Sequence, residues 1–534
     1  MDWQHWAGRL LSVVFEDAHF LAVNKPAGLA VVTPGGTSGP GLDPLVSVHG
    51  GATFGVVRPL EQHTSGILLL PKSREAAHKL TTALDESPAR TEYLAVTRGQ
   101  LKKRRSSPAP VRKGSPVDWD GQVMRRRGEL SLVRFRHEGR RTSAVRADLQ
   151  SMGLVTLGDV AKKPGATRRR PGGRMFLHRA QVRFRHPFTG KTVTISATVP
   201  PVFNAALGQT DLIDDTLHVA LVSRLPLLLS GRTDAYRLFT GQPEGVPGLV
   251  VEQFGPVLIL QIHEGKFHGP TDRVRRIARW YSRLLDVPAV YGKRFVRNRS
   301  GAEADPARHY DPNPLLGESC PAEILIDENG LRLAVRPYDG FSTGLFLDGR
   351  DTRRRVRELA AGGRVLNAFA YTCGFSVAAA IGQAAQTVSV DISAKALEWG
   401  RRNFEINHLP LDDHQFIRSE QFEYFNRARR QGRTFDLIVL DPPSFARTKR
   451  PKTLFSVVTD LQRLVTEALT VLAPGGSVLL STNNRTRTVS WLSGQIAEAA
   501  AAAKRRFRVV DTPPLPLDFA ADRDYAKTII ARFP

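Results

Sequence analysis

The sequence predicts a multidomain α/β protein whose C-terminal part is a doubly wound, mostly parallel sheet. Its 534 residues exceed the usual size of one domain, so we expect two or three domains. In the C-terminal part, short apolar runs alternate with segments of helical spacing, which is the pattern of strand–helix–strand units. The apolar runs are 364–369, 387–390, 435–440 and 477–481, and the helical segments include 394–407 and 456–472.

The N-terminal part has the pattern of an α+β domain with a mixed or antiparallel sheet. Short apolar runs alternate with turns along residues 8–100, and the alternation returns later in this half of the chain. The expected strands are 11–15, 20–23, 66–70, 130–136 and 192–199, and 74–84 has helical spacing.

Changes in the pattern of apolar and polar residues divide the chain into three parts. Around 205–230 the strands give way to a helical connector, and a small unit with its own strand at 257–261 follows. We therefore expect an N-terminal α+β domain over 8–215, a connector with a small α+β domain over 216–322, and an α/β domain over 323–534.

The chain is strongly basic, with a formal net charge of +25 and a pI of about 10.6. Such a protein is expected to bind a polyanion, because neutralising phosphates releases their counterions. A generically basic proteome or a solubility effect is the alternative, and we favour nucleic acid. Two basic loops, 101–118 and 162–174, could lie on phosphates or, with equal weight, be solvated.

Cysteine content and the first residues bear on the compartment. Cys320 and Cys373 are the only cysteines, which excludes a disulfide framework and a cysteine-based metal site, and we expect no metal. Residues 1–5 lack the charged-then-apolar pattern of a signal peptide, and no apolar stretch is long enough to span a membrane. These observations predict a protein of the reducing cytoplasm.

The segment 364–376 predicts a strand, a turn and the start of a helix. Such a turn lets backbone N–H groups and a helix N-terminus approach a ligand closely. With a single glycine, Gly374, it is a weak dinucleotide-binding motif by itself. The next strand ends at Asp391, where an acid can accept hydrogen bonds from ribose hydroxyls. Asp391 could instead cap the helix 394–407, but Ser393 suits that role equally well.

The apolar strand 435–440 runs directly into Asp441-Pro-Pro-Ser-Phe445. This segment combines a carboxylate, two rigid prolines whose carbonyls point outward, and an aromatic ring on which a base can stack. A methyltransferase that modifies a base needs these groups at the carboxyl end of a strand. The order and spacing of this motif after the turn and Asp391 make the combination a strong signal, although each part alone is weak.

Residues 323–534 resemble the class I S-adenosylmethionine-dependent 23S rRNA methyltransferases of the RlmI/RlmK group. The resemblance rests on 343–350, 367–374, 397–403 and 441–445, and 231–252 is similar to the small central domain of that group. It implies a Rossmann-like sheet, S-adenosylmethionine (SAM) as cofactor, and 23S rRNA or ribosomal precursor particles as partner. The cofactor-binding residues that it implies are Asp348, Arg350, Asn367, Phe369, Tyr371, Thr372, Gly374, Asp391, Ile392, Ser393, Asp441 and, in place of the family's adenine-side acid, Glu420.

The cysteine positions bear on which base atom is methylated. Methylation of pyrimidine C5 needs a cysteine thiolate that adds to C6. The cytosine-modifying branch carries this cysteine in the stretch that corresponds here to 476–485, which has none. We interpret Cys373 as a packing residue, and Cys320 lies in a linker, so covalent C5 chemistry is disfavoured. The run 483–485 and the tail 515–523 instead resemble the branch that methylates guanine N7.

Guanine N7 is a lone-pair acceptor with no proton to remove. Methyl transfer to it needs alignment with the methyl sulfonium and exclusion of water rather than a strong base. We assign Asp441 and Asn483 as orienting residues and Phe445 as the stacking platform for a flipped base. Pro442, Pro443 and Asn484 complete the predicted catalytic set. An exocyclic amine stays an alternative acceptor, because the same motif suits amines.

The first half of the chain resembles the RluA-type pseudouridine synthases over about residues 8–205. The matching segments are 13–28, 64–72, 92–96, 141–146 and 177–187. Glu61 stands where the family has its catalytic Asp, and a misplacement of about 1 Å can cost roughly a hundredfold in rate. Pro59 replaces the arginine that supports base flipping, whereas Tyr93 and Arg146 remain. We interpret the synthase site as degenerate and the domain as an RNA-binding arm.

The sequence thus predicts an rRNA methyltransferase that carries a pseudouridine-synthase-like domain. A bifunctional enzyme with both activities is the first alternative. The second alternative is a non-catalytic ribosome-assembly factor that binds RNA and retains only the folds. Binding of SAM separates this last alternative from the other two.

Overall fold

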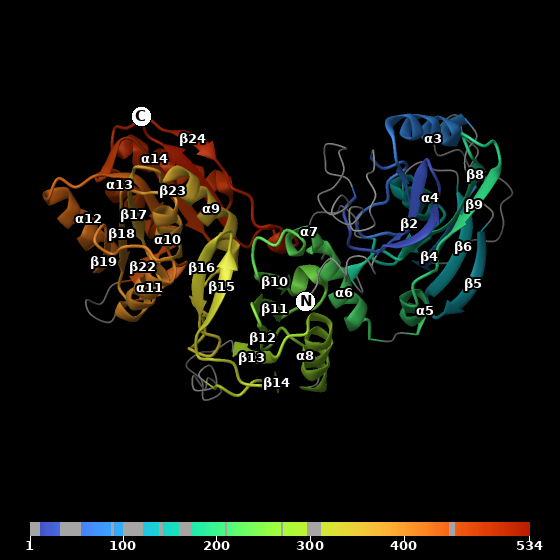
Figure 1. Ribbon diagram of the computed structural model, residues 1–534, viewed down its shortest axis with the longest axis horizontal. Helices are drawn as coiled ribbons and strands as arrows, with labels where there is room; N and C mark the ends of the chain where they lie inside the picture. The colour runs from blue at the N-terminus through green and yellow to red at the C-terminus, as the bar shows by residue number, and fades with distance from the viewer. Residues whose placement is uncertain are drawn as a thin grey trace. The chain divides into compact units, whose positions relative to one another are not determined.

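The computed structural model describes most of the chain, and Figure 1 traces it from the N-terminus to the C-terminus. The described ranges are 11–31, 55–86, 90–99, 121–137, 142–159, 173–208, 211–268, 271–295, 311–447 and 454–534. The basic segment 101–118 and most of the basic loop 162–174 lie outside them. The chain forms two compact units, and the predicted division into three domains stays a prediction. One unit contains Met1–Gly231, Gly241–Leu249 and Gly265–Asp286, and the other contains Arg232–Thr240, Val250–Glu264 and Val287–Pro534.

The N-terminal unit is built on a nine-stranded mixed sheet with the order β1-β2-β3-β8-β4-β6-β5, to which β7 and β9 are added. All of its strand pairs are antiparallel except β3·β8, which is parallel. This confirms the expected mixed sheet. The elements are β1 (Ser12–Glu16), β2 (Phe20–Lys25), β3 (Ser65–Pro71), α3 (Arg74–Glu86), β4 (Arg90–Arg98), β5 (Gly121–Arg127), β6 (Leu130–His137), α4 (Thr142–Ser151), β7 (Val155–Thr156), β8 (Leu177–Arg185), β9 (Thr192–Ser196), α5 (Val202–Leu207), α6 (Ile213–Ser223), α7 (Leu225–Leu228) and α8 (Thr271–Leu285).

Strand β3 lies between β2 and β8 in this sheet and is buried along its whole length. The neighbouring strand β8 explains why residue 66 of β3 is a glycine. Gly66 has a φ of +116°, and a Cβ atom there would lie 2.3 Å from the carbonyl oxygen of Arg179. Only glycine fits such a close approach between two strands. The synthase-like residues Glu61, Tyr93 and Arg146 all belong to this unit.

The C-terminal unit begins with a five-stranded sheet of order β10-β11-β12-β13-β14 and a two-stranded ribbon β15-β16. Within the five-stranded sheet, β12 and β13 are parallel over seven residue pairs. The elements are β10 (Ala235–Phe239), β11 (Leu249–Phe254), β12 (Val257–His263), β13 (Ala289–Phe295), β14 (Leu316–Gly317), β15 (Ile324–Glu328) and β16 (Leu331–Val335).

The main body of this unit is a seven-stranded sheet of order β19-β18-β17-β20-β23-β25-β24. The five strands from β19 to β23 are parallel, and β25 is antiparallel to both of its neighbours. The doubly wound, mostly parallel sheet expected from the sequence is therefore confirmed. The elements are α9 (Arg350–Leu359), β17 (Arg364–Ala368), α10 (Gly374–Ile381), β18 (Gln386–Asp391), α11 (Ala394–Ile406), β19 (His414–Arg418), α12 (Gln421–Arg430), β20 (Phe435–Leu440), β21 (Phe445–Arg447), β22 (Leu454–Ser456), α13 (Val457–Leu469), β23 (Leu472–Thr482), α14 (Val489–Ala502), β24 (Arg508–Asp511), a short 3₁₀ helix η5 (Leu517–Phe519) and β25 (Lys527–Arg532).

Helices cover both faces of the seven-stranded sheet (Figure 1). Buried side chains of α12, α13 and α14 pack against one face, and those of α9 and α10 pack against the other. The strand order reverses between β17 and β20, and a reversal of this kind leaves a crevice at the carboxyl ends of the strands. In the part of the chain that the structure describes, no helix is long and apolar enough to cross a membrane.

Candidate active site

A cavity of about 400 Å³ lies at the carboxyl ends of β17, β18, β20 and β23. Its walls come from the segments that follow these strands, from the stretch that leads into α9, and from residues before and within β25. Twelve predicted site residues line it: Asp348, Phe369, Tyr371, Thr372, Gly374, Asp391, Ile392, Glu420, Asp441, Pro442, Pro443 and Asn483. Sequence separation among these residues is large, so the topology of the sheet brings them together.

The turn after β17, residues 369–373, has an unusual backbone, and we call it the cofactor turn. Phe369, Tyr371 and Cys373 all have positive φ angles, of 65°, 47° and 62°. Non-glycine residues adopt this left-handed conformation at a cost of roughly 1–2 kcal/mol each. The N–H groups of Ala370 and Cys373 donate to the carbonyls of Val390 and Ala370, at 3.0 and 2.8 Å, so these two donors are already used within the protein.

Contacts from three directions hold the turn in this shape. The Thr372 hydroxyl donates to the Gly344 carbonyl at 2.6 Å, and the Asn403 amide donates to the Thr372 carbonyl at 2.9 Å. The backbone N–H of Tyr371 donates to Asp391 at 2.9 Å. At the end of the turn, the first residue of α10 is Gly374, and Cys373 gives this helix no side-chain cap. An uncapped helix N-terminus that lines a cavity is suited to hold a carboxylate.

Asp391 ends β18 and faces the cavity beside this turn. Its two oxygens accept from the backbone N–H groups of Tyr371 and Ser393, at 2.9 and 2.8 Å, and each oxygen keeps a further lone pair. Burial raises the pKa of Asp391, and the backbone hydrogen bonds act against that rise. Ser393 is the N-cap of α11 and accepts from the N–H of Ala396, so Asp391 is not needed as a cap. Ile392 is 44% exposed and offers an apolar surface in the cavity.

Glu420 lies on the same side of the cavity and is the N-cap of α12. Its side chain accepts from the N–H of Glu423 at 3.2 Å. Burial raises the pKa of Glu420, while the N–H donors at the start of the helix oppose this. A carboxylate in this position has a free oxygen for an amine donor such as the exocyclic amine of adenine.

Asp441 follows β20 and exposes its carboxyl group to the cavity. The protein atoms around the cavity and, secondly, the neighbouring carboxylate of Asp348 raise the pKa of Asp441 to about 7. The guanidinium of Arg353 acts in the opposite direction. Burial also raises the pKa of Asp348. The two carboxylates therefore resist being ionised together, and a cation placed between them would stabilise the charged forms.

The residues after Asp441 and β23 form the other side of the cavity. Pro442 is buried and Pro443 is exposed, and both line the wall. The Ser444 hydroxyl donates to Oδ1 of Asn483 at 2.6 Å, which leaves the amide nitrogen of Asn483 as a donor toward the cavity.

Five predicted site residues do not line the cavity. Phe445 is 61% exposed at the start of β21. Asn484 uses its side-chain oxygen within a local turn, where it accepts from the N–H and the hydroxyl of Thr486. Asn367 is fully buried within β17 and donates to Ser376 at 2.9 Å. The fourth residue, Ser393, is the helix cap described above, and the fifth is Arg350.

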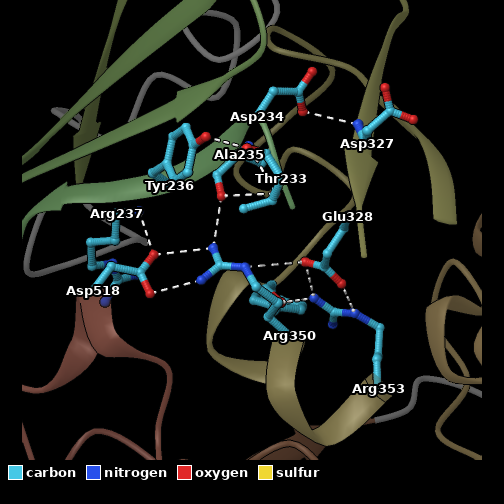
Figure 2. Close-up of polar contacts among 11 residues, drawn as sticks. Thr233, Asp234, Ala235, Tyr236, Arg237, Asp327, Glu328, Arg350, Arg353 and Asp518 are labelled. Carbon is cyan, nitrogen blue, oxygen red and sulfur yellow. Dashed lines mark hydrogen bonds and ion pairs between the residues drawn. The ribbon is translucent and has the colours of Figure 1, made fainter. Parts of the chain in front are cut away.

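Arg350 lies in a buried ion-pair network, which Figure 2 shows, and it does not line the cavity. Its guanidinium donates to both oxygens of Asp518, at 2.8 and 3.1 Å, and to the carbonyl of Ala235 at 2.7 Å. The expected contact of Arg350 with the cofactor is thus replaced by a structural role. The reason is that Asp518, which is 168 residues away in the sequence, satisfies this guanidinium.

The second arginine of the network, Arg353, connects it to the cavity. Arg353 donates to both carboxylate oxygens of Glu328 at 2.6 and 2.8 Å, and it also lines the cavity wall. Because Asp518 belongs to η5, the network holds the segment from Pro513 to Leu515, which forms another part of the wall. The sequence did not identify the lining residues Phe346, Thr352, Arg353, Phe455, Pro513 and Tyr525.

The predicted synthase-like residues lie in the other unit. Arg146 donates to Glu61 at 2.8 Å and to Asp159 at 2.6 Å, so one guanidinium holds two carboxylates. Tyr93 is fully buried, and its hydroxyl accepts from Arg179 at 3.3 Å. The structure therefore brings Glu61 and Arg146 together and gives Tyr93 a different arginine partner.

Comparison with known families agrees with the division into two units. Residues 309–528 match the family described as S-adenosylmethionine-dependent methyltransferase. Residues 19–151 match the family described as RNA pseudouridylate synthase.

Individual relatives match the larger part of the chain. The ribosomal RNA large subunit methyltransferase of Deinococcus radiodurans is 34% identical over 310 residues, which cover 56% of this chain and 74% of that protein. The ribosomal RNA large subunit methyltransferase I of Klebsiella pneumoniae is 34% identical over 280 residues, which cover 52% and 67%. In the crystal structure of SMU.776, a methyltransferase complexed with S-adenosylhomocysteine (SAH), the protein is 29% identical in sequence to this chain. The superposition has a TM-score of 0.53 and covers 66% of this chain and 87% of SMU.776.

Proposed function

Since this chain belongs to the family of the S-adenosylmethionine-dependent ribosomal RNA large subunit methyltransferases, we propose that it methylates guanine N7 in 23S rRNA. The observation that carries this proposal is the single cavity that joins the cofactor turn to Asp441, Pro442, Pro443 and Asn483. SAM bound against the turn would direct its methyl group toward a base held beside these four residues.

The cofactor residues fit SAM in chemical type and order. The uncapped start of α10 suits the methionine carboxylate. Asp391 would accept from the ribose hydroxyls, Ile392 would contact the adenine ring, and Glu420 would accept from its exocyclic amine. SAM supplies an electrophilic methyl group, and the protein supplies position and a site from which water is excluded.

The base-side residues suit the edge of guanine that carries N7. That edge presents two neighbouring acceptors, N7 and O6. The free amide donor of Asn483 can hold O6, which leaves N7 unbonded and free to attack. Asp441 would orient the sulfonium through its charge, and the exposed ring of Phe445 offers a stacking surface beside the motif.

The two cysteines support this choice over a pyrimidine. Neither residue lines the cavity. The Cys373 thiol is fully buried, and burial raises its pKa to about 12, so it is neither accessible nor ionised. Addition of a thiolate to C6 of a pyrimidine, which C5 methylation needs, has no candidate nucleophile here.

Mapping the product on RNA tests the proposal. Purified protein, isotopically labelled SAM and unmodified 23S rRNA should yield labelled N7-methylguanosine, detected by nucleoside mass spectrometry. The same position should lose its methyl group in rRNA from a deletion strain. A label found on pyrimidine C5 or on an exocyclic amine would overturn the N7 assignment, and absence of SAM binding by calorimetry would favour a non-catalytic assembly factor.

The N-terminal unit is proposed to hold RNA without isomerising uridine. Arg146 binds Glu61 and Asp159 at once, and Glu61 is longer by one methylene than the aspartate of the synthases. The retained Glu61–Arg146 pair does favour one second candidate, a bifunctional enzyme, because it keeps a carboxylate beside an arginine. Pseudouridine measurement on treated rRNA separates them: no pseudouridine supports the RNA-holding role, whereas turnover that is lost in Glu61→Gln supports the bifunctional enzyme.

A further inference from the structure

Helix α8 (Thr271–Leu285) separates its residues cleanly by polarity. The side chains of Val274, Ile277, Ala278, Tyr281 and Leu285 are buried. The opposite side carries Arg275, Arg279 and Arg283, all of which are exposed. These three residues follow each other at intervals of four, so they form one row, which we call the α8 arginine row.

Ion pairing distinguishes this row from the other arginines of the helix. Arg273 donates to Asp211 at 3.1 Å, and Arg276 donates to Asp214 at 2.9 Å. Across the described ranges of the chain, no hydrogen bond or ion pair is found for the three arginines of the row. Asp272, in the first turn, is the one acidic residue of α8 and has no ion pair with the row.

An unpaired row of this kind acts against the stability of its own helix. Like charges four residues apart repel each other, and Asp272 offsets only the first turn. Arg273 and Arg276 have acidic partners in the chain, so among the arginines of α8 the lack of an acidic partner is specific to the row. An external polyanion would remove the repulsion, and a row with a repeat of about 6 Å along the axis is suited to a backbone of regularly spaced charges.

We propose that the α8 arginine row contacts the phosphate backbone of the RNA substrate. The inference rests on the proposed function, which makes RNA the substrate, and it deepens it by naming a surface on which the RNA lies. Charge complementarity supports this occupant, because the whole chain carries a formal charge of +25 and arginine pairs well with phosphate oxygens. The row reads charge and not sequence, so it positions the RNA while the cavity selects the base.

The test removes the row from the full-length protein. The variant Arg275→Ala/Arg279→Ala/Arg283→Ala keeps the helix, because alanine is a strong helix former. The matched control is Arg354→Ala/Arg401→Ala/Arg429→Ala, which removes the same charge from the outer sides of α9, α11 and α12, where each arginine has an acidic partner. Binding to transcribed 23S rRNA is measured at a series of KCl concentrations, with circular dichroism as the test of folding.

For the row variant, the slope of log association constant against log KCl is expected to be shallower by about two to three, because each phosphate contact contributes about 0.7–0.9. The single variant Arg279→Gln should lower the slope by roughly one, which keeps the test valid if the triple variant does not fold. SAM affinity should stay the same. If the slope is unchanged in the row variant, or if the control variant lowers it equally, the proposed contact between the α8 arginine row and RNA is wrong. If the unaltered protein binds SAM but methylates no RNA, the proposed function fails instead.

Discussion

Asp441 has a carboxyl group whose charge changes in the neutral pH range, because the protein atoms around the cavity and the neighbouring Asp348 carboxylate raise its pKa to about 7. A raised pKa means that the group is mostly neutral at pH 6 and mostly ionised at pH 8. SAM carries a positive sulfonium, whereas its product S-adenosylhomocysteine (SAH) has a neutral sulfur. Ionised Asp441 therefore favours SAM over SAH, and the neutral acid does not.

We predict that the ratio of the SAH and SAM dissociation constants rises several-fold between pH 6 and pH 8. Isothermal titration calorimetry at a series of pH values measures both constants. In Asp441→Asn the ratio should be small and independent of pH, since the asparagine keeps the shape but carries no charge. An equally steep pH dependence in Asp441→Asn would mean that another group binds the sulfonium.

The raised pKa of Asp441 also affects the folding stability of the cofactor-free protein, which falls as the pH rises. The folded protein holds the proton of Asp441 more tightly than the unfolded chain, in which the pKa of an aspartate is the ordinary 3.8. The contribution of this proton to stability is therefore present below that value and is lost as the pH rises through 7. Asp441→Asn should remove this pH dependence from the unfolding midpoint in urea.

Cys373 and Gly400 form a contact that can be tested by a double-mutant cycle. A Cβ atom on Gly400 would lie 2.3 Å from the Cys373 sulfur, so Gly400→Ala overpacks α11 against the cofactor turn. We expect this change to cost about 1–3 kcal/mol of unfolding free energy. Adding Cys373→Ala should restore part of the loss, because the sulfur is removed while the Cβ atom of residue 373 would still lie 2.9 Å from the added Cβ. Urea unfolding of the four proteins in the cycle gives the coupling energy.

Cys373→Ala alone tests the noncovalent mechanism. Methyl transfer should be retained, because the thiol is buried and does not line the cavity. The rate is measured with labelled SAM and 23S rRNA at saturating cofactor. A variant that is inactive while folding and SAM binding stay intact would make Cys373 a participant in catalysis.

At the scale of elements, the Arg350–Asp518 ion pair joins α9 to η5. Arg350 is 2% exposed and Asp518 is fully buried. Arg350→Ala leaves the Asp518 carboxylate without this partner, which costs about 3–5 kcal/mol in buried pairs.

We predict that Arg350→Ala lowers the free energy of unfolding by that amount and also weakens SAM binding, because the cavity wall at 513–515 loses its support. The control is Arg354→Ala on the same helix, whose exposed pair with Glu358 is worth less than about 1 kcal/mol. Urea titration and calorimetry measure the two effects. If both variants lose similar amounts of unfolding free energy and SAM affinity, the buried network contributes no more than an exposed ion pair.

The sequence predicted the regular elements well and the site only in part. Strand β20 and helix α11 were predictable because apolar periodicity is a local property of the chain. The pairing of Arg350 with Asp518 was not predictable, since the two residues are 168 positions apart in the sequence. Nothing in the residue types of Phe369 or Tyr371 indicates a positive φ, and the exposed Phe346 lies in an irregular segment without a period to identify it.

At the scale of the molecule, the cavity belongs to one compact unit and the α8 arginine row belongs to the other. Hydrogen–deuterium exchange should therefore separate the two ligands. We predict that SAH slows exchange at 369–376, 391–393 and 441–444, whereas 23S rRNA slows it in α8. Protection of β3 or β8 by SAH would contradict the assignment of the cofactor to the C-terminal unit.

The left-handed residues of the cofactor turn have a consequence for the kinetics of turnover. Contacts within the protein hold this turn: Thr372 is bonded to Gly344 and Asn403, and the N–H of Tyr371 is bonded to Asp391. The turn therefore has its shape before a ligand arrives. A preformed slot spares each arriving cofactor the entropy of ordering a loop. We therefore expect SAM and SAH to exchange without a slow conformational phase, and each round of methylation to wait on the RNA rather than on the cofactor.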